Sequence, residues 1–294
     1  MSLKRKLKSC WSLNNNVKIF LLLISIVLAT ATNSQELYPF TEPASNMPAK
    51  SLSLKMSAML GKGVHGNRLE QRYSPEVMFG LGKKWMLHAG FTFSNMYESF
   101  YYYESARLYA KYRFLSKDDV HKHFRMAAFA MAAYSRNHLH HNELNLMGDH
   151  SGIQAGLIAT QLWNKLAVSG TASLIEVLDE KRNDKSVPQQ YAFESLNYSL
   201  SAGYLVLPLN YTDYNQTNLN IYAELLGGRN LDWEYEKYFL DLAPSIQLIF
   251  KSTSKLNLGY RFQLKSDIYR NMKNSWMISY EYIFLNALRK RSAK

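Results

Sequence analysis

The feature that most constrains this chain is a strict alternation of apolar and polar side chains in its last extended segment, residues 275–284. Trp276, Tyr280 and Phe284 belong to a series at every second position that is wholly apolar or aromatic, and most residues between them are polar. Side chains of a β-strand point to opposite faces in turn, so the pattern predicts a strand with one apolar face. Its recurrence along the chain matters, because each strand of a transmembrane barrel carries only a weak signal.

Twelve strands of this kind are expected between residues 49 and 285. The alternation is clear in residues 52–60, 85–94 and 256–264, whereas the segments on either side of the Asn164-Lys165 turn are rich in Gly and Ala. Small residues pack either inward or outward, so the faces of those two strands are the hardest to assign.

Two prolines fall inside expected strands, at Pro75 and Pro244. Each removes one backbone donor from the ladder. We therefore expect a β-bulge at either position.

Alternation alone does not say which face is inside, because a soluble barrel with an apolar lumen has the same period. Two further patterns favour a membrane barrel. Short and long connections alternate, except for a longer link around residues 207–215, and aromatic residues gather near both ends of the apolar faces. We predict an all-β fold: a transmembrane antiparallel up-and-down β-barrel of about 12 strands in the outer membrane of a Gram-negative bacterium. Outer-membrane lipid and the barrel-insertion machinery are its expected partners.

Charged residues on the opposite faces are expected to line the lumen, because Arg or Lys on a lipid face costs about 2–4 kcal/mol at the midplane. Four of them, Glu224, Asp241, Arg261 and Glu281, either form buried ion pairs that close the lumen or line a narrow polar pore. A barrel of 12 strands lies between about eight, which side chains fill, and about 16, which leave a channel. The predicted lumen-lining residues are Glu76, His88, Arg107, Lys111, Arg125, Glu224, Asp241, Arg261 and Glu281.

The N-terminus predicts export. A basic region, an apolar run at residues 19–29 and an A-x-A site form a secretory signal peptide. The run is shorter than the roughly 20 apolar residues that a membrane-spanning helix needs. The Pro-rich stretch that follows is expected to be irregular, either as a plug in the periplasmic mouth or as a disordered leader. The predicted organisation is a signal peptide at 1–31, a Pro-rich periplasmic segment at 32–48, the barrel at 49–285 and a basic tail at 286–294.

The basic composition does not indicate a partner nucleic acid. The formal net charge of +12 falls to about +3 once five cations of the signal peptide and four of the tail are set aside, so no basic patch is expected on the barrel. The only cysteine, Cys10, lies in the signal peptide. The mature chain therefore has no thiol for disulfides, metal binding or redox chemistry, and no cofactor is expected.

Three histidines, His138, His140 and His141, fall in one long connection. An H-x-H pair in extended chain presents two imidazoles on one side to a metal ion. The spacing is not a defined zinc signature, and the only nearby carboxylates are Glu143 and Asp149, so a solvated polar loop is the favoured interpretation.

No catalytic pattern is found: the sequence has no G-x-S-x-G and no H-E-x-x-H, and no Ser and His are expected at matching depth on adjacent strands. We therefore expect a non-enzymatic protein, a narrow pore or transporter for a small solute. The alternative is a structural or interaction barrel with a lumen filled by side chains. A metal-capturing protein and a barrel hydrolase are less favoured.

Several stretches resemble an uncharacterised outer-membrane β-barrel family of Bacteroidetes-type bacteria; they are LYPFTEPASNMP, KYRFLSKDDVHKHFRMAAFA, GYLVLPLNYTDYNQTNLNIYAELLGGRNLD, LAPSIQLIF and LNLGYRFQL. The likeness covers nearly the whole mature chain and implies the fold and the location. It implies no activity, since that family has no established substrate. A looser likeness is to the barrels grouped with the meta-pathway of phenol degradation, presumed transporters of small aromatics. Unlike many outer-membrane barrels, the chain continues for ten residues beyond Phe284.

Overall fold

The computed structural model describes residues 38–63, 68–120, 122–179, 191–209, 213 and 215–289. The predicted signal peptide, 1–31, lies outside the described residues, as do the first residues of the predicted Pro-rich segment and the end of the basic tail. Among the described residues, no helix is both long and apolar enough to cross a membrane.

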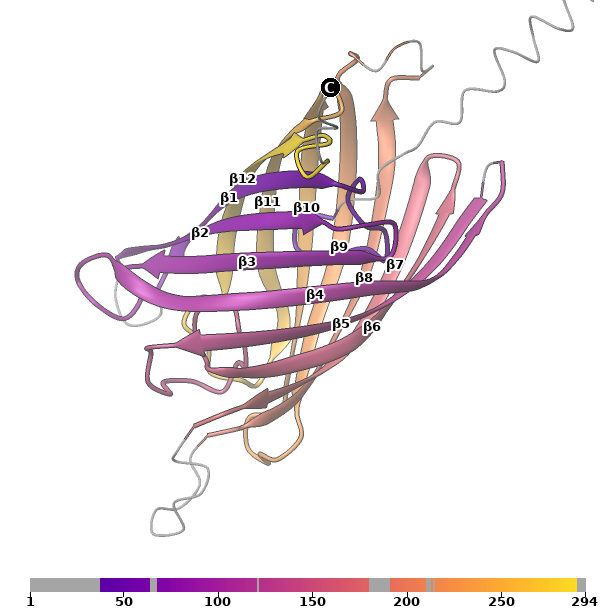
Figure 1. Cartoon of the computed structure of the whole chain (residues 1–294). Coiled ribbons are helices and arrows are strands. Elements are labelled where there is room, and N and C mark those ends of the chain that lie inside the picture. Colours follow the sequence, from indigo (N-terminus) through magenta and orange to yellow (C-terminus); the bar gives the residue numbers. More distant parts are fainter. Residues whose placement is uncertain are drawn as a thin grey trace, which may run out of the picture. The chain divides into compact units, whose positions relative to one another are not determined.

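The described residues form 12 strands that close into one antiparallel barrel (Figure 1). Each strand pairs with its neighbours in the sequence, and β1 pairs with β12 to complete the cylinder. The predicted up-and-down barrel is confirmed. The strands are β1 Ser51–Lys62, β2 Leu69–Gly80, β3 Trp85–Ser94, β4 Tyr102–Asp118, β5 Lys122–Ser135, β6 Gly152–Trp163, β7 Leu166–Val177, β8 Glu194–Leu207, β9 Asn218–Asn230, β10 Tyr238–Phe250, β11 Ser254–Ser266 and β12 Asn274–Phe284.

The alternation in the sequence separates an inside from an outside. In β12, Trp276 and Tyr280 are exposed, whereas Ser279 and Glu281 are buried. Every strand contributes at least one exposed large apolar side chain. An apolar surface of this extent is unfavourable in water and matches lipid, where the closed ladder also leaves no unpaired strand edge.

The bulge expected at Pro75 or Pro244 is wrong. The register on the two sides of Pro75 is the same, since Tyr73 pairs with Phe93 and Glu76 with Gly90, and it is likewise unchanged across Pro244 between β10 and β11. Each proline is paired with one neighbouring strand and unpaired with the other. Pro75 pairs with Met56 of β1 but with no residue of β3, and Pro244 pairs with Ala223 of β9 but with no residue of β11. A missing donor is thus absorbed locally, without the slip that would move the following side chains to the other face. The register shifts lie elsewhere, at Thr92/Phe93, Arg113/Leu115, Leu205/Leu207 and Leu240/Asp241.

The connections alternate in length as predicted. The short ones, β2–β3, β4–β5, β6–β7 and β10–β11, join their strands at one end of the barrel, where β1 starts and β12 ends. The link at 208–217 is the long exception at that end. We call this end periplasmic, because outer-membrane barrels have short periplasmic turns and long external loops.

Candidate functional site

The interior of the barrel is occupied from both ends. Residues 38–49, called here the N-terminal segment, enter from the periplasmic end. Residues 136–151, the β5–β6 loop, enter from the external end. Each is held by buried polar contacts with the inward faces of the strands, and together they define the site.

Glu224 of β9 anchors the beginning of the N-terminal segment. Its carboxylate accepts a hydrogen bond of 3.0 Å from the Phe40 N–H and one of 2.6 Å from the Thr41 hydroxyl. Further along, the Ala44 N–H donates to the hydroxyl of Thr160 at 2.9 Å, and Ala44 is fully buried. Of the two alternatives for this stretch, the structure shows the one in which it enters the barrel.

Lys111 of β4 holds the middle of the same segment. Its ammonium group is fully buried and donates to the carbonyl oxygens of Pro43 and Ser45, at 2.7 and 2.9 Å, while it pairs with Glu42 at 3.2 Å. Burial by itself would raise the pKa of Glu42, but the charges of Lys111, His88 and Lys55 together outweigh it and lower that pKa. Arg125 adds a bond of 2.8 Å to the Ser45 hydroxyl.

The β5–β6 loop is tied to the wall by a cluster of two carboxylates and two arginines. Glu143 of the loop pairs with Arg261 at 2.9 Å and with Arg270 at 2.8 Å, and both arginines also bind Asp241. Burial would raise the pKa of Glu143, but the charges of Arg270 and Arg261 lower it to about 2. Glu143 is therefore ionised at any physiological pH.

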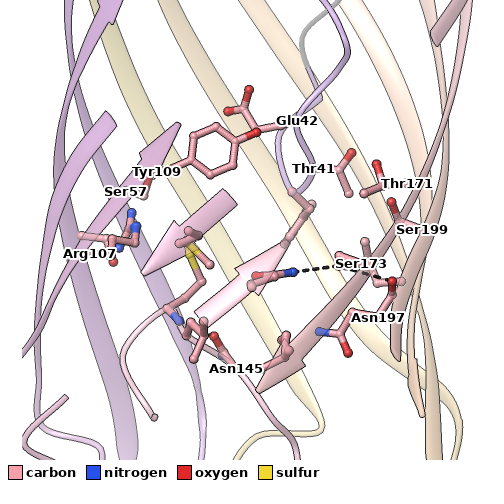
Figure 2. A pocket seen from close by; sticks show the side chains of 18 of the residues that line it. Thr41, Glu42, Ser57, Arg107, Tyr109, Asn145, Thr171, Ser173, Asn197 and Ser199 are labelled. Atoms are coloured by element: carbon pink, nitrogen blue, oxygen red, sulfur yellow. Dashed lines mark hydrogen bonds between the residues drawn. The ribbon is translucent and has the colours of Figure 1, made fainter. Parts of the chain in front are cut away.

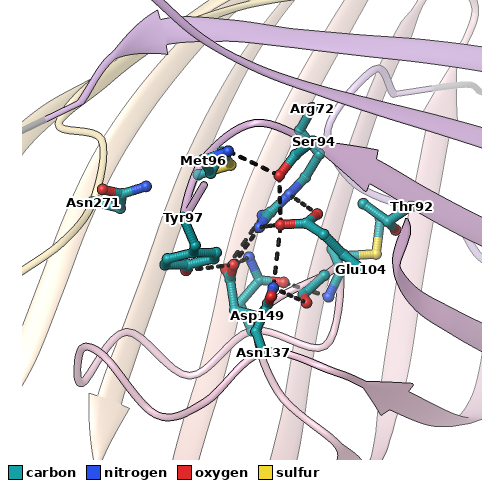
Figure 3. Close-up of polar contacts among 12 residues, drawn as sticks. Arg72, Thr92, Ser94, Met96, Tyr97, Glu104, Asn137, Asp149 and Asn271 are labelled. Atoms are coloured by element: carbon teal, nitrogen blue, oxygen red, sulfur yellow. Dashed lines mark hydrogen bonds and ion pairs between the residues drawn. The ribbon is translucent and has the colours of Figure 1, made fainter. Parts of the chain in front are cut away.

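A second polar cluster holds the far end of the loop, and Figure 3 shows its centre. Arg72 of β2 pairs with Glu104 of β4 at 2.8 Å and with Asp149 of the loop. The Tyr97 hydroxyl donates to Asp149 at 2.8 Å. All three members of the ion-paired set are buried, so each charge depends on the others for compensation.

Apolar contacts complete the fixation of the loop. Leu139, Leu144 and Leu146 are buried in one cluster with inward-facing residues of β5 and β7, namely Met131, Ile175 and Val177, and with Ala192 and Phe193. The loop is thus packed inside the barrel instead of extending from it.

Between the N-terminal segment and the β5–β6 loop lies a chamber of about 420 Å³ (Figure 2). Phe40, Thr41 and Glu42 line it from the N-terminal segment, and Leu144 and Asn145 line it from the loop. Strands β2 to β8 supply most of its wall, including a set formed by Glu76, His88 and Arg107. Glu76 accepts from His88 at 2.6 Å and pairs with Arg107 at 3.0 Å.

No family model matches the chain, and no curated protein matches it. Among solved structures, an outer membrane channel from Pseudomonas putida F1 has a TM-score of 0.56 at 13% identity, covering 85% of this chain and 100% of that chain. The NanC porin has a TM-score of 0.49 at 12% identity, covering 79% of this chain and 98% of that chain.

The chain has the fold of an outer-membrane β-barrel. At 13% identity, the similarity to the Pseudomonas putida F1 channel shows the fold alone. This fold agrees with the closed ladder and the apolar exterior.

The structure places the predicted lumen-lining residues in five groups. Glu224, Asp241, Arg261 and Glu281 were expected either to form ion pairs or to line a pore. Of these four, only Asp241 and Arg261 pair with each other. Glu224 binds the N-terminal segment, and Glu281 pairs with Lys255 at 3.2 Å and accepts from Ser53. The remaining groups are Glu76 with His88 and Arg107, and Lys111 and Arg125 with the N-terminal segment.

Several residues of the site were not predicted. Arg72 and Lys255 lie on strands at the same inward parity as predicted residues, so the alternation itself would have identified them. Arg270, Tyr97 and Asn145 lie in connections, where no period assigns a side chain to the lumen.

The histidines of the β5–β6 loop have different environments. His138 and His140 are exposed, whereas His141 is buried with its Nε2 atom 2.8 Å from the Tyr97 hydroxyl. The Tyr97 ring stacks on the His140 ring, with 5.0 Å between the ring centroids. No three His, Cys, Asp or Glu side chains of the described ranges are grouped so as to hold a metal ion. Metal binding by His138, His140 and His141 therefore stays a prediction.

Proposed function

We propose that the protein is a narrow outer-membrane channel for small solutes, whose lumen is closed at rest by the N-terminal segment. The observation that carries this proposal is the chamber of about 420 Å³ inside the barrel, bounded by the N-terminal segment on one side and by the β5–β6 loop on the other. A cavity lined with mixed polar and apolar groups is what a solute-binding constriction requires.

The N-terminal segment is suited to be a removable closure. It contributes no strand to the barrel. Its contacts with the wall include side-chain hydrogen bonds and one ion pair, from Glu224, Thr160, Lys111 and Arg125, and the apolar packing of Tyr38 and Ala44 in two small buried clusters. The barrel closes without it, because β1 pairs with β12 from Leu52↔Phe284 to Gly61↔Ser275. Removing the segment is therefore expected to open the lumen and to leave the cylinder intact.

The test is ion conductance across a planar lipid bilayer. The exported protein is compared with a variant that lacks residues 38–48 and with a matched control that lacks residues 290–294 of the basic tail. We expect the first deletion to raise the single-channel conductance several-fold and the tail deletion to leave it unchanged. If both deletion variants fold, as judged by a heat-dependent shift in gel mobility, and neither conducts, the channel proposal is wrong.

A structural or interaction barrel is the second candidate. The observation that favours it is the number of compensated buried charges in the lumen, such as Lys255 with Glu281 and Arg270 with Asp241. A silent but folded barrel lacking residues 38–48 would favour this alternative.

We also propose a family for the chain and a non-enzymatic role. The quoted sequence stretches support membership of the Bacteroidetes-type barrel family, and the continuation of the chain beyond Phe284 requires insertion machinery that tolerates an extension. The chain is proposed to be non-enzymatic; hydrolysis of lipid or peptide by the purified barrel, lost on substitution of one Ser or His, would contradict this.

A further inference from the structure

We infer that the chamber binds a neutral saccharide of one or two rings. This inference rests on the proposed function, since the solute reaches the chamber through the lumen, and it specifies the substrate class. Four features of the chamber wall support it.

The first feature is a wall of uncharged polar side chains. Thr171 and Ser173 of β7 and Asn197 and Ser199 of β8 face the chamber, as Figure 2 shows, and Gln154 of β6 donates to the Ser173 hydroxyl at 2.8 Å. Hydroxyl and amide groups both donate and accept hydrogen bonds. They match a ligand whose own polar groups are hydroxyls.

The second feature is an apolar and aromatic wall. Tyr109 stacks on Phe129 with ring centroids 5.4 Å apart, and Met131, Leu144 and Phe239 also line the chamber. The C–H faces of a sugar ring are apolar and pack against aromatic rings, while its hydroxyls point outward at the edge. A ligand with both kinds of surface uses both walls.

The third feature is a pair of buried polar atoms without a hydrogen bond. Among the described residues, neither the Nε2 atom of His88 nor the hydroxyl of Tyr109 has a partner, and both residues line the chamber. His88 is 5% exposed, and its Nδ1 atom lies 2.6 Å from Glu76, which assigns the Nδ1 proton and leaves Nε2 an acceptor in the neutral ring. Leaving such atoms unpaired is unfavourable. A ligand hydroxyl, which donates and accepts, satisfies them.

The fourth feature is the compensation of charge around the chamber. The arginines that line it, Arg72, Arg107 and Arg261, each already bind a carboxylate. Lys55 lies between Glu76 and Glu281 in the strand register. An anionic ligand would have to displace a carboxylate from an arginine, and a cationic one would have to displace an arginine from a carboxylate, so a neutral ligand is favoured.

The size of the chamber limits the ligand. Its volume of about 420 Å³ is near the lower end of the roughly 300–1,000 Å³ of ligand pockets. One or two sugar rings therefore fit, and longer chains do not fit without movement of the N-terminal segment or the β5–β6 loop.

Isothermal titration calorimetry tests the inference on the full chain in a polyoxyethylene detergent, which has no sugar headgroup to compete. Glucose, maltose and cellobiose are the neutral probes, and gluconate is the anionic one. We expect at least one neutral sugar to bind with a Kd of millimolar or below, and gluconate to bind at least tenfold more weakly. Tyr109→Phe, which removes one hydroxyl, and Asn197→Leu should each weaken binding at least tenfold, whereas Tyr134→Phe on the lipid-facing side should have no effect.

Binding of no neutral sugar, equal binding of gluconate, or sugar binding unaffected by Tyr109→Phe and Asn197→Leu would overturn the inference. Tyr109→Phe preserves shape, and its fold is checked by the heat-dependent gel shift. The two proposals fail separately: conductance after removal of residues 38–48 without sugar binding overturns only the saccharide site, and sugar binding to a barrel that never conducts overturns only the channel.

Discussion

The ammonium group of Lys111 donates a hydrogen bond of 2.7 Å to the carbonyl oxygen of Pro43, which fixes the N-terminal segment to the inner wall of β4. Lys111 has no exposed surface, and it also contacts Ser45 and Glu42 of the same segment. One side chain thus satisfies three oxygen atoms of the N-terminal segment. Its loss would leave those oxygens, including a carboxylate, without a cation.

Lys111→Met is therefore expected to release the N-terminal segment and to increase the conductance measured in planar bilayers toward that of the variant lacking residues 38–48. Methionine keeps much of the side-chain length and removes the charge. Lys117→Met, at an exposed position of the same strand, is the matched control and should conduct like the parent protein. A Lys111→Met barrel that is folded and as closed as the control would show that Lys111 does not hold the segment.

Acid is expected to loosen the β5–β6 loop through His150. Burial and the neighbouring charge of His141 lower the pKa of His150 from 6.5 to about 4. His150 is harder to protonate in the folded loop than in the open one. Its contribution to the stability of the folded loop is therefore fully present above pH 6.5. That contribution is lost as the pH falls from 6.5 toward 4, by about 2 kcal/mol at pH 5.

Hydrogen exchange of the amides in residues 136–151 measures this effect. Protection should be constant from pH 8 to 6.5 and fall below it, after correction for the intrinsic exchange rate. His150→Gln, which cannot titrate, should abolish the fall, and His123→Gln at the periplasmic start of β5 should leave it intact. The same acid-dependent loss in His150→Gln would assign it to another group.

Arg72 is expected to be essential to the stability of the external half of the barrel. Arg72→Met removes the cation that compensates Glu104 and Asp149, both buried. Breaking a buried ion pair by removing one partner costs about 3–5 kcal/mol. Urea unfolding from lipid vesicles should show a loss of that size. Arg72→Met combined with Glu104→Gln and Asp149→Asn, which removes the uncompensated charges, should recover part of it; no recovery would show that packing of the arginine, and not its charge, is what matters.

How far the sequence predicts this architecture depends on where a residue lies. On strands, the two-residue period assigns each side chain to a face, which is why the exterior of β12 and the twelve-stranded closure were predictable. The period also covers Arg72, four residues before Glu76 on the same face. It contains no information on connections: Glu143 and Arg270 meet although 127 positions separate them.

The N-terminal segment illustrates the same limit. Pro39, Pro43 and Pro48 exclude a regular strand, and that expectation agrees with the irregular backbone found there. Prolines do not specify a location. The position inside the lumen is set by Lys111 and Glu224, whose charges on inward faces require partners that only a tertiary structure identifies.

If the exterior faces lipid, a charged side chain in place of Leu108 should destabilise the barrel. The Leu108 side chain is 66% exposed, and Leu108 pairs with Ala89 halfway along β3, so it lies near the middle of the apolar band. Leu108→Lys should reduce the free energy of unfolding from vesicles by about 2–4 kcal/mol, because a lysine there must be placed in hydrocarbon. Val120→Lys, at a more exposed position in the short β4–β5 connection, should cost almost nothing, because that lysine remains in water. Equal costs at the two positions would mean that the outer surface of β4 does not face lipid, and the membrane-spanning arrangement would be wrong.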